Sequence, residues 1–196
     1  MKKRIKQISL ICVVILTFFS GCDGQKHYAK VGATYITEMD FMYSRILHDA
    51  RRKKGTGHMN DCYNTDEWVL RQIVKNELYY QYALKEGIEF SEEANARVEA
   101  LYSERFDSET GHFYDAKRAF MSKYSMNEEE FREYACSQIK REVMAVDGMQ
   151  QILTEYYLEH SDCCISCSTN SVRIILDESK LSELSKEYNV EWYYGQ

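Results

Sequence analysis

The stretch that decides the fold runs from Asn127 to His160 and reads NEEEFREYACSQIKREVMAVDGMQQILTEYYLEH. Asn127 and Glu130 form a capping pair for the start of a helix. Such a helix is roughly 50 Å long at 1.5 Å per residue. Gly148 costs about 1 kcal/mol relative to Ala in a helix, so we expect it to mark a bend. The apolar residues recur in steps of three and four, the spacing of one helix face: Phe131, Ala135, Ile139, Val143, Val146, Met149 or Gln150, Leu153 and Tyr157.

The sequence before this stretch predicts four shorter helices, because each segment joins end signals to an apolar stripe. Thr37, with Asp40 three residues later, begins the first helix, which ends at Gly55. The second helix is expected to begin at residues 64–66 and to end at Gly87. The third begins at Glu92, after the cap residue Ser91, and ends at about Phe106, and the fourth covers residues 113–124. The chain contains no proline, so nothing in it forbids long helices.

Both ends of the folded region favour short strands. Residues 29–36 are rich in β-favouring side chains, and residues 172–176 read Val-Arg-Ile-Ile-Leu. A short helix over 178–188 and a second strand over 190–194 follow. We therefore predict a mainly α domain with a small sheet formed by N- and C-terminal strands, in which 29–36 pairs with 172–176.

The first 22 residues have the layout of an export signal. Four basic residues precede an apolar run over residues 8–19, which is too short for a comfortable membrane span of about 20 residues. Phe19-Ser20-Gly21-Cys22 then resembles the lipobox of a bacterial lipoprotein, although Phe19 stands where Leu is usual. The resemblance implies cleavage before Cys22, a diacylglycerol on its sulfur and a mature protein anchored outside the cytoplasm. A plain anchor helix, or secretion with cleavage elsewhere, is the alternative.

The expected mature chain, from Cys22 to Gln196, is acidic. Removal of four of the 25 basic residues leaves 21 against 31 acidic residues, a net charge of −10. Such a surface repels phosphate backbones and anionic lipid headgroups, so we expect no nucleic-acid partner. Contact with the membrane is expected only through the lipid on Cys22, and residues 22–28 provide a short polar tether.

The order of these elements is similar to that of a known family. Val31-Gly-Ala33, within the expected first strand, precedes Ile36-Thr-Glu-Met-Asp-Phe41. A helix then ends in Ala83 and Gly87-Ile88, and Ser91-Glu-Glu93 opens the next one. Residues 121–133, MSKYSMNEEEFRE, follow in the expected place. Over residues 29–160 the chain resembles the SurA N-terminal chaperone domain, which also occurs in PrsA-type foldase lipoproteins.

The resemblance does not extend to the catalytic domain of those foldases. They carry a parvulin-type prolyl isomerase domain, which needs on the order of 100 residues. Only residues 161–196 follow the long helix, and they contain no Gly-Gly-x-Leu-Gly turn. The resemblance therefore implies the chaperone module alone and no enzymatic activity. Residues 161–196 are expected to form a Cys-rich segment followed by strand, helix and strand.

His160, Cys163, Cys164 and Cys167 form the one cluster with other possible chemistry. Cys164 and Cys167 have redox-motif spacing, and all four side chains could bind zinc. An oxidising compartment instead favours a structural disulfide or a spare thiol. With Cys62 and Cys136, five cysteines remain after lipidation of Cys22, so at least one stays free or pairs between molecules.

These observations predict a membrane-anchored chaperone that binds unfolded or partly folded secreted polypeptides without ATP and without a cofactor. Apolar grooves between helices, including the long helix, are expected to bind these clients. The chain contains no Ser/His/Asp constellation, phosphate-binding glycine loop or His-x-Glu metal motif. A lipoprotein adaptor for one specific partner is the alternative, and a thiol or metal protein using the cysteine cluster is a third.

Overall fold

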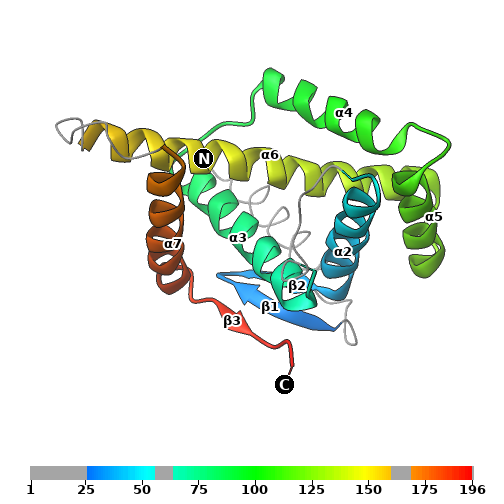
Figure 1. The fold of residues 1–196 in the computed structure, drawn as a ribbon, viewed down its shortest axis with the longest axis horizontal. Coiled ribbons are helices and arrows are strands. Elements are labelled where there is room, and N and C mark those ends of the chain that lie inside the picture. Colours follow the sequence, from blue (N-terminus) through cyan, green and yellow to red (C-terminus); the bar gives the residue numbers. More distant parts are fainter. Residues whose placement is uncertain (1–25, 56–63, 160–168, 196) are drawn as a thin grey trace, which may run out of the picture.

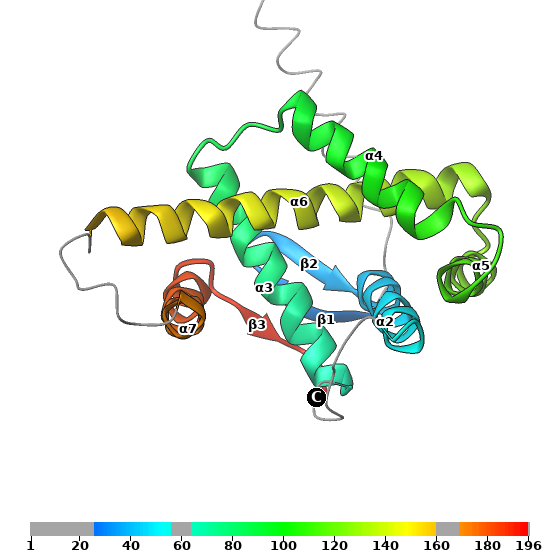
Figure 2. The same cartoon turned by 45° about the horizontal axis from the view of Figure 1, so that its top comes forward.

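A single long helix, α6 (Glu128–Glu159), is the element around which the other elements pack. The structure, a computed structural model, describes residues 26–55, 64–159 and 169–195. In Figures 1 and 2, α3 crosses α6 on the side of the sheet, and α4 runs along its opposite side. The remaining elements are β1 (His27–Val31), β2 (Thr34–Thr37), α2 (Glu38–Lys53), α3 (Asp66–Lys85), α4 (Glu92–Phe106), α5 (His112–Tyr124), α7 (Thr169–Glu187) and β3 (Glu191–Trp192).

The helix ends form where their caps predict them. The Thr37 side chain and the Asp40 carboxylate make a reciprocal capping box at the start of α2. Asn127 and Glu130 bond each other's backbone N–H groups before α6, at 2.8 and 2.9 Å. Gly87 has a φ of +72° after α3, which suits the C′ position of a helix. The long helix expected up to about residue 160 is confirmed by α6.

The sheet contains a hairpin where we expected a single strand over residues 29–36. Gly32 and Ala33 form a two-residue turn between β1 and β2, and Gly32 has a φ of +58°. Glycine at the first turn position is typical of a type II′ hairpin. The strand order is β2-β1-β3, and both pairings are antiparallel.

The C-terminal strand of this sheet is β3, not residues 172–176. Ala29 pairs with Trp192 and Lys30 with Glu191. The prediction of a strand over 172–176 was wrong, because these residues belong to α7. A short apolar run fits a buried strand and a buried helix equally well by periodicity. The small sheet formed from both ends of the chain is nevertheless confirmed.

Two hydrophobic clusters divide the interior. The first joins the sheet to α3, to Leu184 of α7 and to Ala145 and Ile152 of α6. The second joins α2, α4 and α5 to the first half of α6, including Phe131 and Ile139. Helix α6 therefore contributes to both clusters and holds them together.

Gly148 allows α6 to pack closely against α3. A Cβ at this position would lie 2.6 Å from the carbonyl oxygen of Tyr79 and 3.1 Å from the Cβ of Ala83. Contacts below 3.0 Å are sterically forbidden, so any larger residue would push the two helices apart. This close crossing gives the glycine a packing role, and α6 continues through it as one helix.

Candidate functional site

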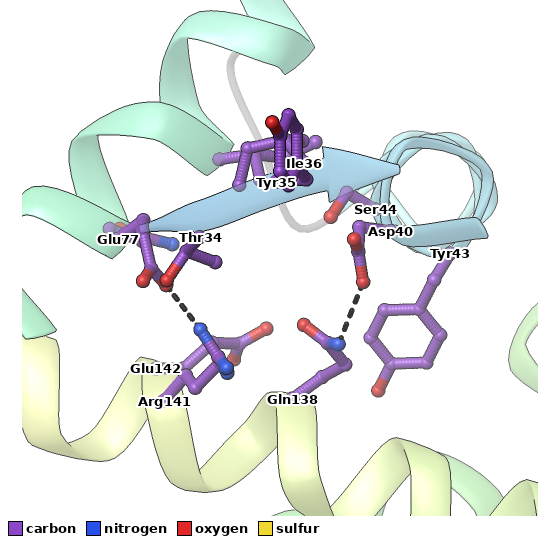
Figure 3. Close-up of a pocket in the computed structure, with 12 residues that line it drawn as sticks. Thr34, Tyr35, Ile36, Asp40, Tyr43, Ser44, Glu77, Gln138, Arg141 and Glu142 are labelled. Carbon is purple, nitrogen blue, oxygen red and sulfur yellow. Dashed lines mark hydrogen bonds and ion pairs between the residues drawn. The ribbon is translucent and has the colours of Figure 1, made fainter. Parts of the chain in front are cut away.

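A small polar cleft of about 100 Å³ opens between β2, α2, α3 and α6. Figure 3 shows β2 on one side of the cleft and α6 on the other. Thr34, Tyr35 and Ile36 line it from β2, and Gln138, Arg141 and Glu142 line it from α6. The cleft lies where elements of the two hydrophobic clusters meet, and its polar side chains bond across this junction.

Asp40 ties α2 to α6 at one end of the cleft. Its Oδ2 accepts hydrogen bonds from the backbone N–H and the hydroxyl of Thr37, at 2.9 and 2.7 Å. Its Oδ1 accepts from the hydroxyl of Tyr134 at 2.9 Å and from the amide of Gln138 at 3.0 Å (Figure 3). Burial, reinforced by this carboxylate, raises the pKa of the Tyr134 hydroxyl. Tyr134 therefore stays protonated and acts as a donor to Asp40.

Glu77 ties α3 to α6 and to the hairpin at the other end. Its side chain is 4% exposed and forms an ion pair with Arg141 (Figure 3). Gln81 donates to Glu77 at 2.9 Å and to the carbonyl of Val31 at 2.9 Å. Burial alone would lower the pKa of Arg141, but the Glu77 carboxylate outweighs it and raises that pKa. Arg141 therefore stays protonated beside this carboxylate.

The carboxylates around the cleft are occupied in holding the fold. The third one, Glu142, accepts from Arg105 of α4 at 2.8 Å. Among the described residues, no group of three His, Cys, Asp or Glu side chains could hold a metal ion. This arrangement is a hydrogen-bonded junction between helices, with a water-accessible space left beside β2.

A second, less polar region surrounds Trp192 of β3. Trp192 is 42% exposed. On one side, Leu70 and Arg71 of α3 with Trp192 and Tyr194 border a hollow of about 340 Å³. On the other side, α3 and α7 border a second hollow of about 290 Å³, into which Leu181 and the same Trp192 face. Trp192 therefore borders both hollows, which together we call the Trp192 groove.

The aromatic side chains beside the groove rest on the hydrophobic core. The rings of Tyr28 and Phe41 lie 5.0 Å apart, and Tyr194 lies 5.4 Å from Tyr28. The backbone N–H groups of Tyr193 and Tyr194 both donate to the carbonyl of Tyr28. These contacts hold the C-terminal residues against the sheet beside the groove.

The residues singled out for lipid, disulfide or metal chemistry lie outside the described residues. This applies to Cys22, to the cluster of His160, Cys163, Cys164 and Cys167, and to Cys62. Cys136, which is described, is a partly buried free thiol, and burial raises its pKa. Cys136 is the one cysteine within the described residues, and the roles expected of the other cysteines stay predictions.

The apolar stripe of the long helix is covered over its first half. Phe131, Ala135, Ile139 and Val143 are all at most 2% exposed, because they pack with residues of α2, α4 and α5. Val146, the next member of the stripe, is 48% exposed. The first half of the stripe therefore belongs to the core, and a client groove that involves the long helix stays a prediction.

Sequence reasoning missed both surfaces described above. Trp192 lay within a predicted strand, and the run Trp192-Tyr-Tyr194 was the available signal of an aromatic surface. The cleft depends on a hairpin that the sequence reading treated as one strand. It also depends on side chains from α2, α3 and α6 that are far apart in the chain.

No helix within the described segments combines the length and the apolar character needed to cross a bilayer. Neither the curated proteins nor the solved structures contained a match to this chain. A protein-family model described as the SurA-like N-terminal domain matches residues 1–145, nearly three quarters of the sequence. This match extends through the hairpin and α2 to α5 and includes α6 as far as Ala145. The mainly helical fold with its small antiparallel sheet agrees with that assignment, and the chain belongs to the family of SurA-like N-terminal domains.

Proposed function

We propose that this protein is a membrane-anchored, extracytoplasmic holdase that binds unfolded secreted or envelope proteins without ATP. The SurA N-terminal domain family is linked to chaperone function, and its members are typically extracytoplasmic. Family membership supports the general class, and the Trp192 groove is the observation that carries the proposal for this chain.

The Trp192 groove has the shape expected of a surface that accepts apolar side chains from many sequences. An isolated flat patch would favour one dedicated partner, whereas a hollowed surface accepts protruding side chains. Trp192 and Tyr194 are 42% and 39% exposed, although large aromatic side chains are usually covered. Both line hollows of a few hundred Å³, large enough for one aromatic or branched side chain each.

The anchor in this proposal is a lipid on Cys22. Only residues 23–26 separate that cysteine from β1, which begins at His27. Four residues span at most about 14 Å when extended, so the domain would work close to the membrane surface. Two acyl chains contribute about 0.8 kcal/mol per buried CH₂, which suffices for stable attachment.

We propose no catalytic step for this chain. The family match is to the N-terminal domain, not to a prolyl isomerase domain. The segment after α6 supplies α7 and β3, which complete the fold by packing on α3 and pairing with β1. Its described part therefore has a structural role in the chaperone domain itself.

An aggregation assay with the soluble chain from Asp23 to Gln196 tests the proposal, because this chain contains every described residue. Near-stoichiometric amounts should suppress aggregation of a reduced or heat-denatured client. Protection should tolerate salt, since burial of apolar area is weakly screened while exposed charge pairs are strongly screened. If aggregation is unchanged and no secreted chain can be crosslinked, the holdase proposal fails.

Two variants separate the Trp192 groove from general stickiness. Trp192→Ala removes the side chain that borders both hollows and should weaken client binding about tenfold, as for a central aromatic anchor. Leu84→Ala is the control. Leu84 is 51% exposed and lies on α3, the helix that borders both hollows, but it lines neither of them. Equal losses in both variants would show that the groove is not the binding surface.

The adaptor reading predicts different behaviour in the same experiments. An adaptor would ignore generic clients and bind one partner at fixed stoichiometry. A thiol or metal protein would lose its activity when Cys163, Cys164 and Cys167 are replaced. In contrast, a holdase should retain client protection in such variants.

A further inference from the structure

Strand β2 has a free edge, and that edge borders the polar cleft. The strand order β2-β1-β3 leaves β2 with β1 as its one partner in the described sheet. Thr34, Tyr35 and Ile36 are consecutive, and side chains of consecutive strand residues point to opposite faces. All three nevertheless line the cleft, so the cleft runs along the edge of the strand (Figure 3).

The hairpin register determines which backbone groups face the cleft. Val31 and Thr34 flank the two-residue turn and form the hydrogen-bonded pair that closes it. The next pair, Lys30 and Tyr35, is then a non-hydrogen-bonded pair, whose N–H and C=O groups point away from each other. On Lys30 these groups face Glu191 of β3, with which Lys30 pairs. On Tyr35 they face the cleft.

The side chain of Tyr35 does not block this edge. Its ring lies on the outer face of the sheet, 4.6 Å from the His27 ring and 5.5 Å from the Lys30 ammonium. The residue is 46% exposed. The opposite wall of the cleft presents side chains of α6, including the Gln138 amide. An entering chain would thus meet backbone groups on one side and polar side chains on the other.

We propose that the cleft binds a short extended segment of an unfolded polypeptide, which pairs with Tyr35 as an added β-strand. Main-chain hydrogen bonds supply such binding, so it depends little on the sequence of the segment. The cleft of about 100 Å³ accommodates only one or two residues of backbone, which matches the single unpaired position of β2. This inference rests on the proposed holdase function and names the backbone as the group recognised.

The charges around the cleft restrict which segments bind. Asp40, Glu77 and Glu142 line it, and two of these carboxylates are paired, Glu77 with Arg141 and Glu142 with Arg105. One negative charge, that of Asp40, is therefore in excess, and it disfavours acidic segments and favours neutral or basic ones. The proposed ligand is therefore an extended neutral or basic segment with free backbone N–H and C=O groups.

A labelled decapeptide of alternating valine and lysine, and its twin N-methylated at every second amide, test the proposal on the unaltered protein. The twin has the same charge and the same side chains, but it cannot donate along one edge. We expect it to bind about five- to tenfold more weakly at physiological salt, the effect of one or two lost hydrogen bonds. Equal affinities for the two peptides would overturn the proposal, whether or not any variant folds.

Two substitutions at one position test the protein side. Tyr35→Pro removes the N–H group at an edge position where proline is tolerated, whereas Tyr35→Val removes the ring and keeps the N–H. Peptide affinity should fall about fivefold in the proline variant and stay unchanged in the valine variant. Amide exchange at Tyr35 should slow when the unmodified peptide binds. Equal losses in the two variants, or an unprotected amide, would overturn the proposal.

The same variants separate this inference from the holdase proposal and from self-association. If Tyr35→Pro suppresses client aggregation as well as the unaltered chain does and binds the peptide equally well, backbone pairing is wrong and the holdase function stands. If the unaltered chain does not suppress aggregation, the holdase function itself is wrong. If Tyr35→Pro instead dissociates a dimer of the unaltered chain, the partner of β2 is a second copy and not a client.

Discussion

Replacement of Gly148 by alanine gives a direct test of how α3 and α6 are packed. The added methyl group would lie 2.6 Å from the carbonyl oxygen of Tyr79, a backbone atom that cannot rotate away. Relief requires the two helices to separate by several tenths of an ångström. Ala145 and Ile152 of α6, which pack in the first hydrophobic cluster on either side of Gly148 in the chain, would have to move as well.

Two opposing effects determine the size of the change. Alanine favours the helix over glycine by about 1 kcal/mol, which stabilises the folded state. Overpacking of a tight contact costs about 2–3 kcal/mol, at the upper end of the usual range because the opposing atom is backbone. We therefore expect the free energy of unfolding to fall by about 1–2 kcal/mol.

Urea unfolding followed by circular dichroism measures this change, and Gln150 provides the control. Gln150 lies on the exposed side of α6 one residue beyond Met149. The difference between Gln150→Gly and Gln150→Ala gives the propensity term alone, about 1 kcal/mol in favour of alanine. If Gly148→Ala stabilises the protein by that same amount, the helices do not cross closely at Gly148.

Four further outcomes test other parts of the description. In a urea titration, Glu77→Ala should lower the free energy of unfolding by about 2–3 kcal/mol, because it breaks the ion pair of a buried carboxylate. Glu67→Ala is the control: the Glu67 side chain is 66% exposed, so loss of its ion pair should lower the free energy of unfolding by less than about 0.5 kcal/mol. Cys22→Ser should leave an unprocessed form and abolish lipid labelling, and an intact Met1 in the unaltered protein would contradict the anchor. A proline-limited peptide assay should show no turnover above background, and clear turnover would contradict a purely binding role. Joint replacement of Cys164 and Cys167 by serine should leave client protection intact. It should lower the free energy of unfolding by a few kcal/mol at most, about what a short disulfide loop contributes. Loss of one zinc equivalent, or of insulin-reductase activity, would instead assign the function to that cluster.

Local signals predicted the helices well because helix ends depend on residues close in sequence. The Asn127 and Glu130 pair and Gly87 each act within one or two turns. The apolar spacing depends in the same way on nearby positions, and it located the core correctly from Phe131 to Val143. Beyond that point the buried residues include Ala145 and Ile152, whereas Val146 of the predicted stripe is 48% exposed. Packing against α3 and the sheet, which are distant in sequence, decides which residues are covered there.

The sheet was predicted less well because its partners are far apart in sequence. Lys30 and Glu191 are 161 positions apart, and only their pairing defines β3. The turn at Gly32 and Ala33 lacks the Asn-Gly or Asp-Gly signal of common hairpins, so residues 29–36 read as one strand. Neither the free edge of β2 nor the Trp192 groove could be inferred before these pairings were known.

The two proposed binding surfaces lie at opposite edges of one three-stranded sheet, with Tyr35 on β2 and Trp192 on β3. Strands lie about 4.8 Å apart, so the two edges are roughly 10 Å from each other. They would recognise different features of a client, because the groove accepts apolar side chains and the edge accepts backbone. An unfolded polypeptide presents both features along almost any stretch, whereas a folded protein buries its apolar side chains and pairs its backbone. Discrimination between folded and unfolded chains therefore needs neither a sequence motif nor ATP, since folding itself removes both features that the domain would bind.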